Sequence, residues 1–180
     1  SKVYVVSNLN QLSSTELNEE EVNYLKRSLK EDFEWKLINR LKEQVYVVKV
    51  NDKSTTQSQE KIRKAGANIT KSLNEFKQKE VAVYDKTKGE VFLASISEGM
   101  ALANYQFLKY FKDAKKKTNT LESIYTQSKA ISKEQLLELN AIVDATFWAR
   151  DLVNEPVSFL NAEELSNQME EMGKKGNFKV

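Results

Sequence analysis

Short apolar runs alternate along the chain with longer segments in which apolar residues recur at helical spacing. Runs rich in β-branched and aromatic residues predict strands, and the strongest, residues 45–50, is almost continuously apolar, as in a strand covered on both faces. Further strands are predicted at 3–6, 35–38, 81–84 and 121–125. Because only a short connection joins 35–38 to 45–50, these two strands are expected to pair antiparallel.

Helices are predicted between the strands from apolar residues spaced three and four positions apart. Residues 58–77 carry the clearest amphipathic stripe. Ser132 and Gln135 have the spacing of a capping box, which opens a helix that runs to about Val153. Other helices are predicted at 19–29, at 91–110, and at 161–172 with Gly173 as the stop signal. This alternation predicts a layered α/β domain with a mixed sheet.

The only proline, Pro156, marks a boundary, because the residue before a proline is disfavoured in a helix. We therefore expect an α/β domain at 1–131, a connecting helix at 132–155 and the start of another domain at 156–180. Residues 177–180 have the pattern of an entering strand, so the natural protein is expected to continue beyond them. Ser1 in place of methionine indicates a processed or tagged start.

The composition is that of an ordinary globular protein, with 40% hydrophobic and 30% charged residues and a net charge of +2. This near-neutral charge argues against an obligate nucleic-acid-binding domain. The chain has no cysteine and no histidine, which excludes disulfides and the commonest metal ligands and general base. No apolar run approaches the roughly 18 residues that span a bilayer, and the start lacks a signal peptide. A cytoplasmic protein without membrane contact is expected.

No segment has the pattern of an active site, and we predict no catalytic, cofactor-binding or metal-binding residue. A glycine-rich phosphate loop is missing. The acidic cluster 19–21 opens a predicted helix and is expected to complement its dipole rather than to hold a metal. The lysines of 112–117 are expected to form a solvated helix end. Ser95 and Ser97 lie in an apolar helix without a neighbouring base, which disfavours a nucleophile.

Several residues near position 100 are harder to interpret from the pattern alone. Glu98 and Asn104 fall in an otherwise apolar helix. They are either buried polar anchors or contacts to a partner, and the sequence leaves both readings open. Phe107 and Tyr110 are expected to pack this helix on the sheet, which explains them better than base stacking does.

Three segments resemble the leucine (cytosol) aminopeptidase family. Residues 98–107, EGMALANYQF, are similar to the family's Glu-Gly helix, and residues 149–156, ARDLVNEP, are similar to its Arg-Asp-Leu-x-Asn-x-Pro junction. Residues 160–163 resemble the cap and first turn of the following helix. Pro156 and Val157 stand where many members have two prolines. By this resemblance the chain is identified as the family's amino-terminal domain plus the start of its catalytic domain.

The resemblance implies a macro-domain-like, three-layer α/β/α sandwich. It implies a parent enzyme that removes amino-terminal residues, leucine among them, from peptides with two divalent metal ions, zinc or manganese, in a cytoplasmic hexamer. The family's metal ligands and catalytic residues lie in its carboxy-terminal domain. These 180 residues would then form a non-catalytic accessory or oligomerisation domain, with the catalytic domain of the same chain as partner.

Two alternatives follow from the same resemblance. One is a macro-domain-type module that binds ADP-ribose or a nucleotide, which the missing glycine-rich loop disfavours. The other is contact with DNA through residues 112–117, which the near-neutral net charge makes the weaker reading.

Overall fold

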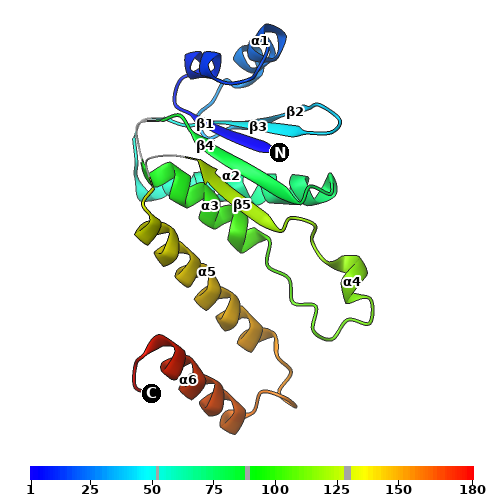
Figure 1. Ribbon diagram of the computed structural model, residues 1–180, viewed down its shortest axis with the longest axis vertical. Coiled ribbons are helices and arrows are strands. Elements are labelled where there is room, and N and C mark those ends of the chain that lie inside the picture. The colour runs from blue at the N-terminus through cyan, green and yellow to red at the C-terminus, as the bar shows by residue number, and fades with distance from the viewer. Residues whose placement is uncertain (52, 88–89, 128–130) are drawn as a thin grey trace. The chain divides into compact units, whose positions relative to one another are not determined.

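The computed structural model describes residues 1–51, 53–87, 90–127 and 131–180. Its centre is a mixed sheet with the strand order β2-β3-β1-β4-β5 (Figure 1). The strands are β1 (Lys2–Val6), β2 (Trp35–Asn39), β3 (Gln44–Lys49), β4 (Glu80–Asp85) and β5 (Ser123–Gln127). All adjacent pairs are parallel except β2 and β3, which are antiparallel as predicted from their short connection.

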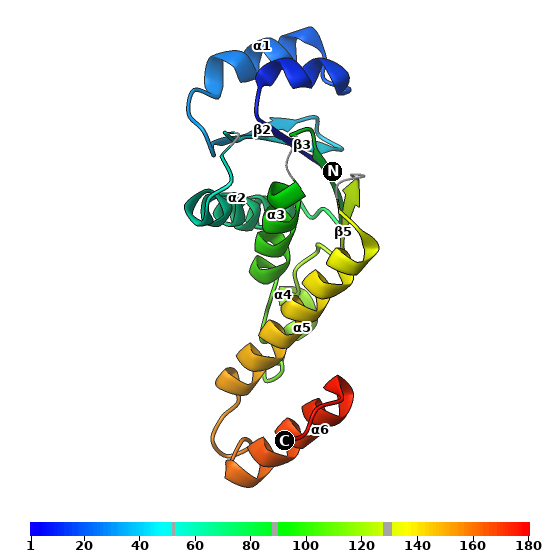
Figure 2. The ribbon, with the colours of Figure 1, turned by 90° about the vertical axis from the view of Figure 1, so that its left-hand side faces the viewer.

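Helices cover both faces of the sheet (Figure 1), which confirms the layered α/β domain predicted from the pattern and the three-layer α/β/α sandwich that the resemblance implies. The helices are η1 (Leu9–Ser14), α1 (Glu19–Ser28), α2 (Thr56–Glu75), α3 (Glu90–Ala103), α4 (Ala114–Lys117), α5 (Lys133–Asn154) and α6 (Ala162–Gly176). Figures 1 and 2 show α1 on one face of the sheet and the pair α2 and α3 on the other. In the part of the chain that the structure describes, no helix is long and apolar enough to cross a membrane.

The core consists of two apolar layers separated by the sheet. One layer joins alternate residues of β1 and β3 to α2 and α3, among them Val5, Tyr46, Ile69 and Ile96. The other layer joins the intervening strand residues to η1 and α1, among them Tyr4, Val47, Leu12 and Leu25. Because β3 contributes to both layers, Val45, Tyr46, Val47 and Val48 are all fully buried. This double burial explains the continuous apolar run in the sequence.

Helices α2 and α3 approach each other closely at two glycines. A Cβ atom added to Gly66 would lie 2.5 Å from the carbonyl oxygen of Ile96. A Cβ atom added to Gly99 would overlap the backbone of Arg63. The absence of a side chain at these two positions therefore sets the spacing of the helix pair.

The chain divides into two compact units, residues 1–143 and 144–180, and the division falls inside α5. In the second unit α6 continues through Gly173, so the predicted stop at this residue is wrong. Asn177, with a φ of 55°, ends the helix instead. The backbone N–H of Phe178 then donates to the carbonyl of Gly173 at 2.9 Å. The tail thus turns back on α6, and residues 177–180 do not form the predicted strand.

Candidate functional site

Glu98 is held inside the domain by an ion pair between helices. Its Oε2 accepts a hydrogen bond from Nε of Arg63 at 2.5 Å, and the two side chains are only 21% and 31% exposed. Arg63 lies on α2 and Glu98 on α3, next to the close approach at Gly99. Of the two readings of Glu98, the structure supports the polar anchor.

Asn104 belongs to a polar network that ends α3. Its Nδ2 donates to the carbonyl of Leu121 at 2.8 Å, and its Oδ1 accepts from Nδ2 of Asn74 at 3.1 Å. Oδ1 of Asn74 accepts in turn from the backbone N–H groups of Thr120 and Leu121 at 2.8 and 3.0 Å. The helix ends at Ala103, so its predicted extension to residue 110 is wrong. These tertiary hydrogen bonds outweigh the helical pattern of the sequence.

The network fixes both ends of a basic segment, residues 105–119. Phe107 and Tyr110 lie outside any helix and pack on each other with ring centres 5.8 Å apart, so their predicted role in packing a helix on the sheet is wrong. Tyr110 and Phe111 remain 44% and 49% exposed. Residues 115–117 form the exposed last turn of α4, a solvated helix end as predicted. Nζ of Lys117 lies 4.2 Å from the ring centre of Phe111.

The acidic cluster 19–21 also has the expected structural role. Asn18 and Glu21 form a capping box at the start of α1. Glu21 in addition accepts a hydrogen bond from Arg40 at 2.6 Å, which lowers the pKa of its carboxyl group. Ser95 and Ser97 are buried in α3, 3% and 5% exposed.

The described residues contain no group of three or more Asp and Glu side chains that could hold a metal ion, and the sequence has no histidine or cysteine. The side chains that the structure describes therefore do not fit the metal pair that the resemblance implies.

Asp85 is the last residue of β4, which pairs in parallel with β1. From this pair the chain order runs outward in both directions, to β3 beyond β1 and to β5 beyond β4. In open α/β sheets this position frequently holds a ligand. Its Oδ1 accepts from the backbone N–H and the hydroxyl of Thr87 at 2.7 and 2.6 Å. Its Oδ2 is buried and has no hydrogen-bond partner within 3.5 Å among the residues that the structure describes. Burial raises the pKa of the Asp85 carboxyl, although the hydrogen bonds from Thr87 and the backbone N–H of Leu93 act in the opposite direction. The carboxyl group stabilises the turn after β4.

The raised pKa of Asp85 predicts a pH-dependent effect of Asp85→Asn. A carboxyl group whose pKa is higher in the folded state favours folding when protonated, and this advantage is lost as the pH rises through the folded-state pKa. The asparagine amide carries no such charge. We therefore expect the Tm of Asp85→Asn, relative to the unchanged chain, to improve as the pH is raised from about 4, the ordinary pKa of an aspartate, toward neutrality. Thermal unfolding across this range checks the slope, and a constant difference would contradict it.

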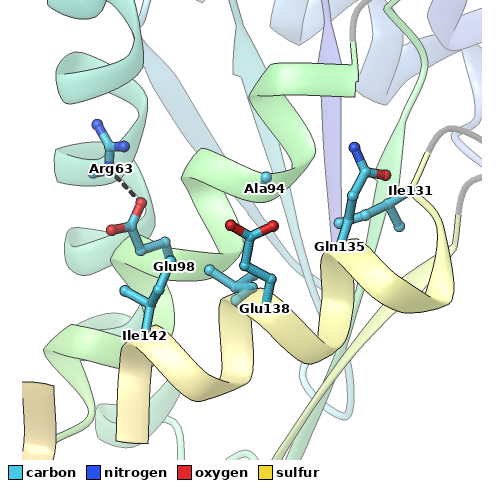
Figure 3. Close-up of a pocket in the computed structure, with 8 residues that line it drawn as sticks. Arg63, Ala94, Glu98, Ile131, Gln135, Glu138 and Ile142 are labelled. Carbon is cyan, nitrogen blue, oxygen red and sulfur yellow. Dashed lines mark hydrogen bonds and ion pairs between the residues drawn. The ribbon is translucent and has the colours of Figure 1, made fainter. Parts of the chain in front are cut away.

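A pocket of about 310 Å³ lies between α3 and the first half of α5, within the first unit. Its polar lining comes from Arg63, Glu98, Gln135 and Glu138, and its apolar lining from Ala94, Ile131, Leu139 and Ile142. Figure 3 shows the carboxylate of Glu138 pointing from α5 toward α3, beside the Arg63–Glu98 ion pair. The sequence did not reveal this site because its members lie on α2, α3, α5 and the segment just before α5, up to 79 positions apart. Only the unusual position of Glu98 in an apolar helix gave a hint.

Residues 43–115 match the family model described as "Cytosol aminopeptidase family, N-terminal domain". The chain is 31% identical over 142 residues to a "Probable cytosol aminopeptidase" of Clostridium perfringens, a match that covers 71% of this chain and 28% of the relative. It is 30% identical over 136 residues to a protein of the same description from Aquifex aeolicus, covering 72% and 27%. The chain thus spans little more than a quarter of these relatives.

Solved structures share the fold. A mutant of tomato leucine aminopeptidase superposes with a TM-score of 0.69 at 11% identity, covering 97% of this chain and 39% of that chain. The bottromycin maturation enzyme BotP in complex with Mn gives a TM-score of 0.68 at 15% identity, covering 98% and 36%. The family model, the curated relatives and the fold agree, and the chain carries the amino-terminal domain of the cytosol aminopeptidase family.

Proposed function

We propose that this chain is the non-catalytic, accessory part of a metal-dependent aminopeptidase, in which residues 156–180 begin the catalytic domain. The observation that carries the proposal is the match to the amino-terminal domain of cytosol aminopeptidases, by a chain that covers about a quarter of its relatives. The junction at 149–156 supports it, because the family-like segment coincides with the end of α5 at Asn154. These matches favour this function over an ADP-ribose or nucleotide module.

The apolar surface of the second unit supports a partner within the same protein. Val153 and Val157 are each 85% exposed and Phe159 is 60% exposed. Several large apolar side chains left in water within one short segment are typical of a surface that is covered by another part of the protein. We propose the catalytic domain of the same chain as that cover.

The whole enzyme, on this proposal, is a cytoplasmic hexamer that cleaves amino-terminal residues such as leucine from peptides. Two divalent ions, zinc or manganese, would polarise the peptide carbonyl and activate a water molecule. The ligands for these ions would come from the domain that follows, since this chain has no histidine or cysteine. The domain described here would contribute to assembly, through surfaces that lie away from the chemistry.

The proposal predicts that the purified 180-residue chain releases no leucine from a leucyl anilide, with or without added zinc or manganese. The physical reason is that the described residues offer no group of three or more carboxylates for a metal ion and the sequence has no histidine or cysteine, so no water would be activated. The matched control is the longer protein with the same metals, which should release the chromophore. Metal-dependent hydrolysis by the 180-residue chain would overturn the non-catalytic assignment.

A further inference from the structure

We propose that the pocket lined by Arg63, Glu98, Gln135 and Glu138 binds a free α-amino acid with an aliphatic side chain. The pocket lies entirely within residues 1–143. Its volume of about 310 Å³ is at the small end of ligand sites, which suits an amino acid better than a nucleotide. The proposal rests on the charges, hydrogen-bonding capacity and apolar lining of this pocket.

Glu138 provides the group that would hold the ammonium of the ligand. Its carboxylate points from α5 into the pocket (Figure 3). Within the described ranges it makes no ion pair or hydrogen bond, whereas Glu98 is already paired with Arg63. A carboxylate beside apolar walls gains most from a cation that brings its own hydrogen-bond donors.

Arg63 provides donors for the carboxylate of the same ligand. Only its Nε is engaged by Glu98, and its NH1 approaches Glu60 no closer than 4.0 Å. The terminal nitrogens of a guanidinium match the two oxygens of a carboxylate. Gln135 adds a further donor, because its Oε1 accepts from the backbone N–H of Ser132 at 2.8 Å and its Nε2 is left to donate.

The apolar part of the lining would receive the side chain of the ligand. Ala94 on α3 and Leu139 on α5 both line the pocket. Figure 3 shows Ile131 and Ile142 toward its two ends. One guanidinium and two carboxylates give the lining a net charge of −1. This negative charge disfavours binding of a purely anionic ligand such as a nucleotide. A zwitterionic amino acid instead finds a partner in the pocket for its ammonium group, its carboxylate and its aliphatic side chain.

Whether the pocket binds an amino acid does not depend on the reaction of the whole protein. The biological role of such binding does depend on it. If the proposed function holds, the amino acid is a product of the reaction, and the amino-terminal domain would sense that product. That second statement rests on the proposed function.

The test is calorimetric titration of the 180-residue chain with L-leucine. We expect saturable binding that weakens about tenfold or more for 4-methylpentanoate, which lacks the amine, and for 3-methylbutylamine, which lacks the carboxylate. Glu138→Gln should weaken leucine binding by a similar factor, whereas Asp144→Asn, which removes a carboxylate from the same helix outside the pocket, should leave it unchanged.

Thermal unfolding of both variants confirms that the fold is intact, which is expected because Glu138 and Asp144 are exposed. Absence of saturable leucine binding, or equal affinity of Glu138→Gln and the unchanged chain, would overturn the proposal. Both results leave the peptidase assay on the longer protein unaffected, so failure here is distinguishable from failure of the proposed function.

Discussion

Replacing Gly99 with alanine is expected to lower the free energy of unfolding by about 2–3 kcal/mol. The new Cβ would overlap backbone atoms of Arg63, which cannot rotate away as a side chain would. Helices α2 and α3 would have to separate, and the buried contacts of Ile62, Ile96 and Met100 would loosen with them. The better helix propensity of alanine, about 1 kcal/mol, offsets only part of this cost.

Urea unfolding followed by circular dichroism measures the effect of Gly99→Ala. The matched control is Gly176→Ala in α6, where the added Cβ meets only the ring of Phe178. That ring is 57% exposed and can rotate, so a change within about 0.5 kcal/mol is expected. Equal losses in the two variants would show that the close approach of α2 and α3 is not what limits the side chain at position 99.

Replacing Asn74 with alanine is expected to cost about 3 kcal/mol. Its Oδ1 is the acceptor for two backbone N–H groups, at Thr120 and Leu121, and its Nδ2 holds Asn104. Leu121 is only 4% exposed, so water cannot readily replace the lost acceptor. Two backbone N–H groups left without an acceptor and a released helix end together account for a cost of this size.

Two measurements distinguish this role from a general loss of packing. Urea unfolding gives the free energy, and the rate of trypsin cleavage at the lysines of residues 112–117 reports how firmly the basic segment is held. Asn74→Asp keeps the acceptor and loses the donor, so we expect a smaller loss than for Asn74→Ala. An alanine variant with unchanged stability and unchanged cleavage would contradict the anchoring role.

The sheet and most helices could be predicted because their residues obey one dominant constraint. Val45 to Val48 are buried on both faces, and the stripe containing Ile62 and Ile69 faces one side only. Burial of this kind requires apolar residues at regular spacing, and this spacing can be recognised in the sequence alone. Capping boxes have the same local character, and the predicted box of Ser132 and Gln135 is confirmed by both of its hydrogen bonds.

The errors and omissions occur where distant residues decide the outcome. The end of α3 depends on Asn74, thirty positions before Asn104, and the partner of Glu98 lies on another helix. The pocket around Glu138 required the same kind of long-range information. The end of α6 is a different kind of error, because the choice lies between local signals: the helix passes Gly173 and ends at Asn177, which adopts the left-handed conformation instead.

Because α5 is a continuous helix, insertions or deletions within it have a different effect from those in a loop. It is one uninterrupted helix of 22 residues that contains the division between the two compact units. Each residue of a helix advances the chain by about 1.5 Å and turns it by about 100°. Losing a single residue in the second half of α5 would rotate the direction of all that follows by about 100°, whereas losing seven would nearly restore the rotational phase. Length variation in this region should therefore follow the helical repeat, unlike variation in a loop.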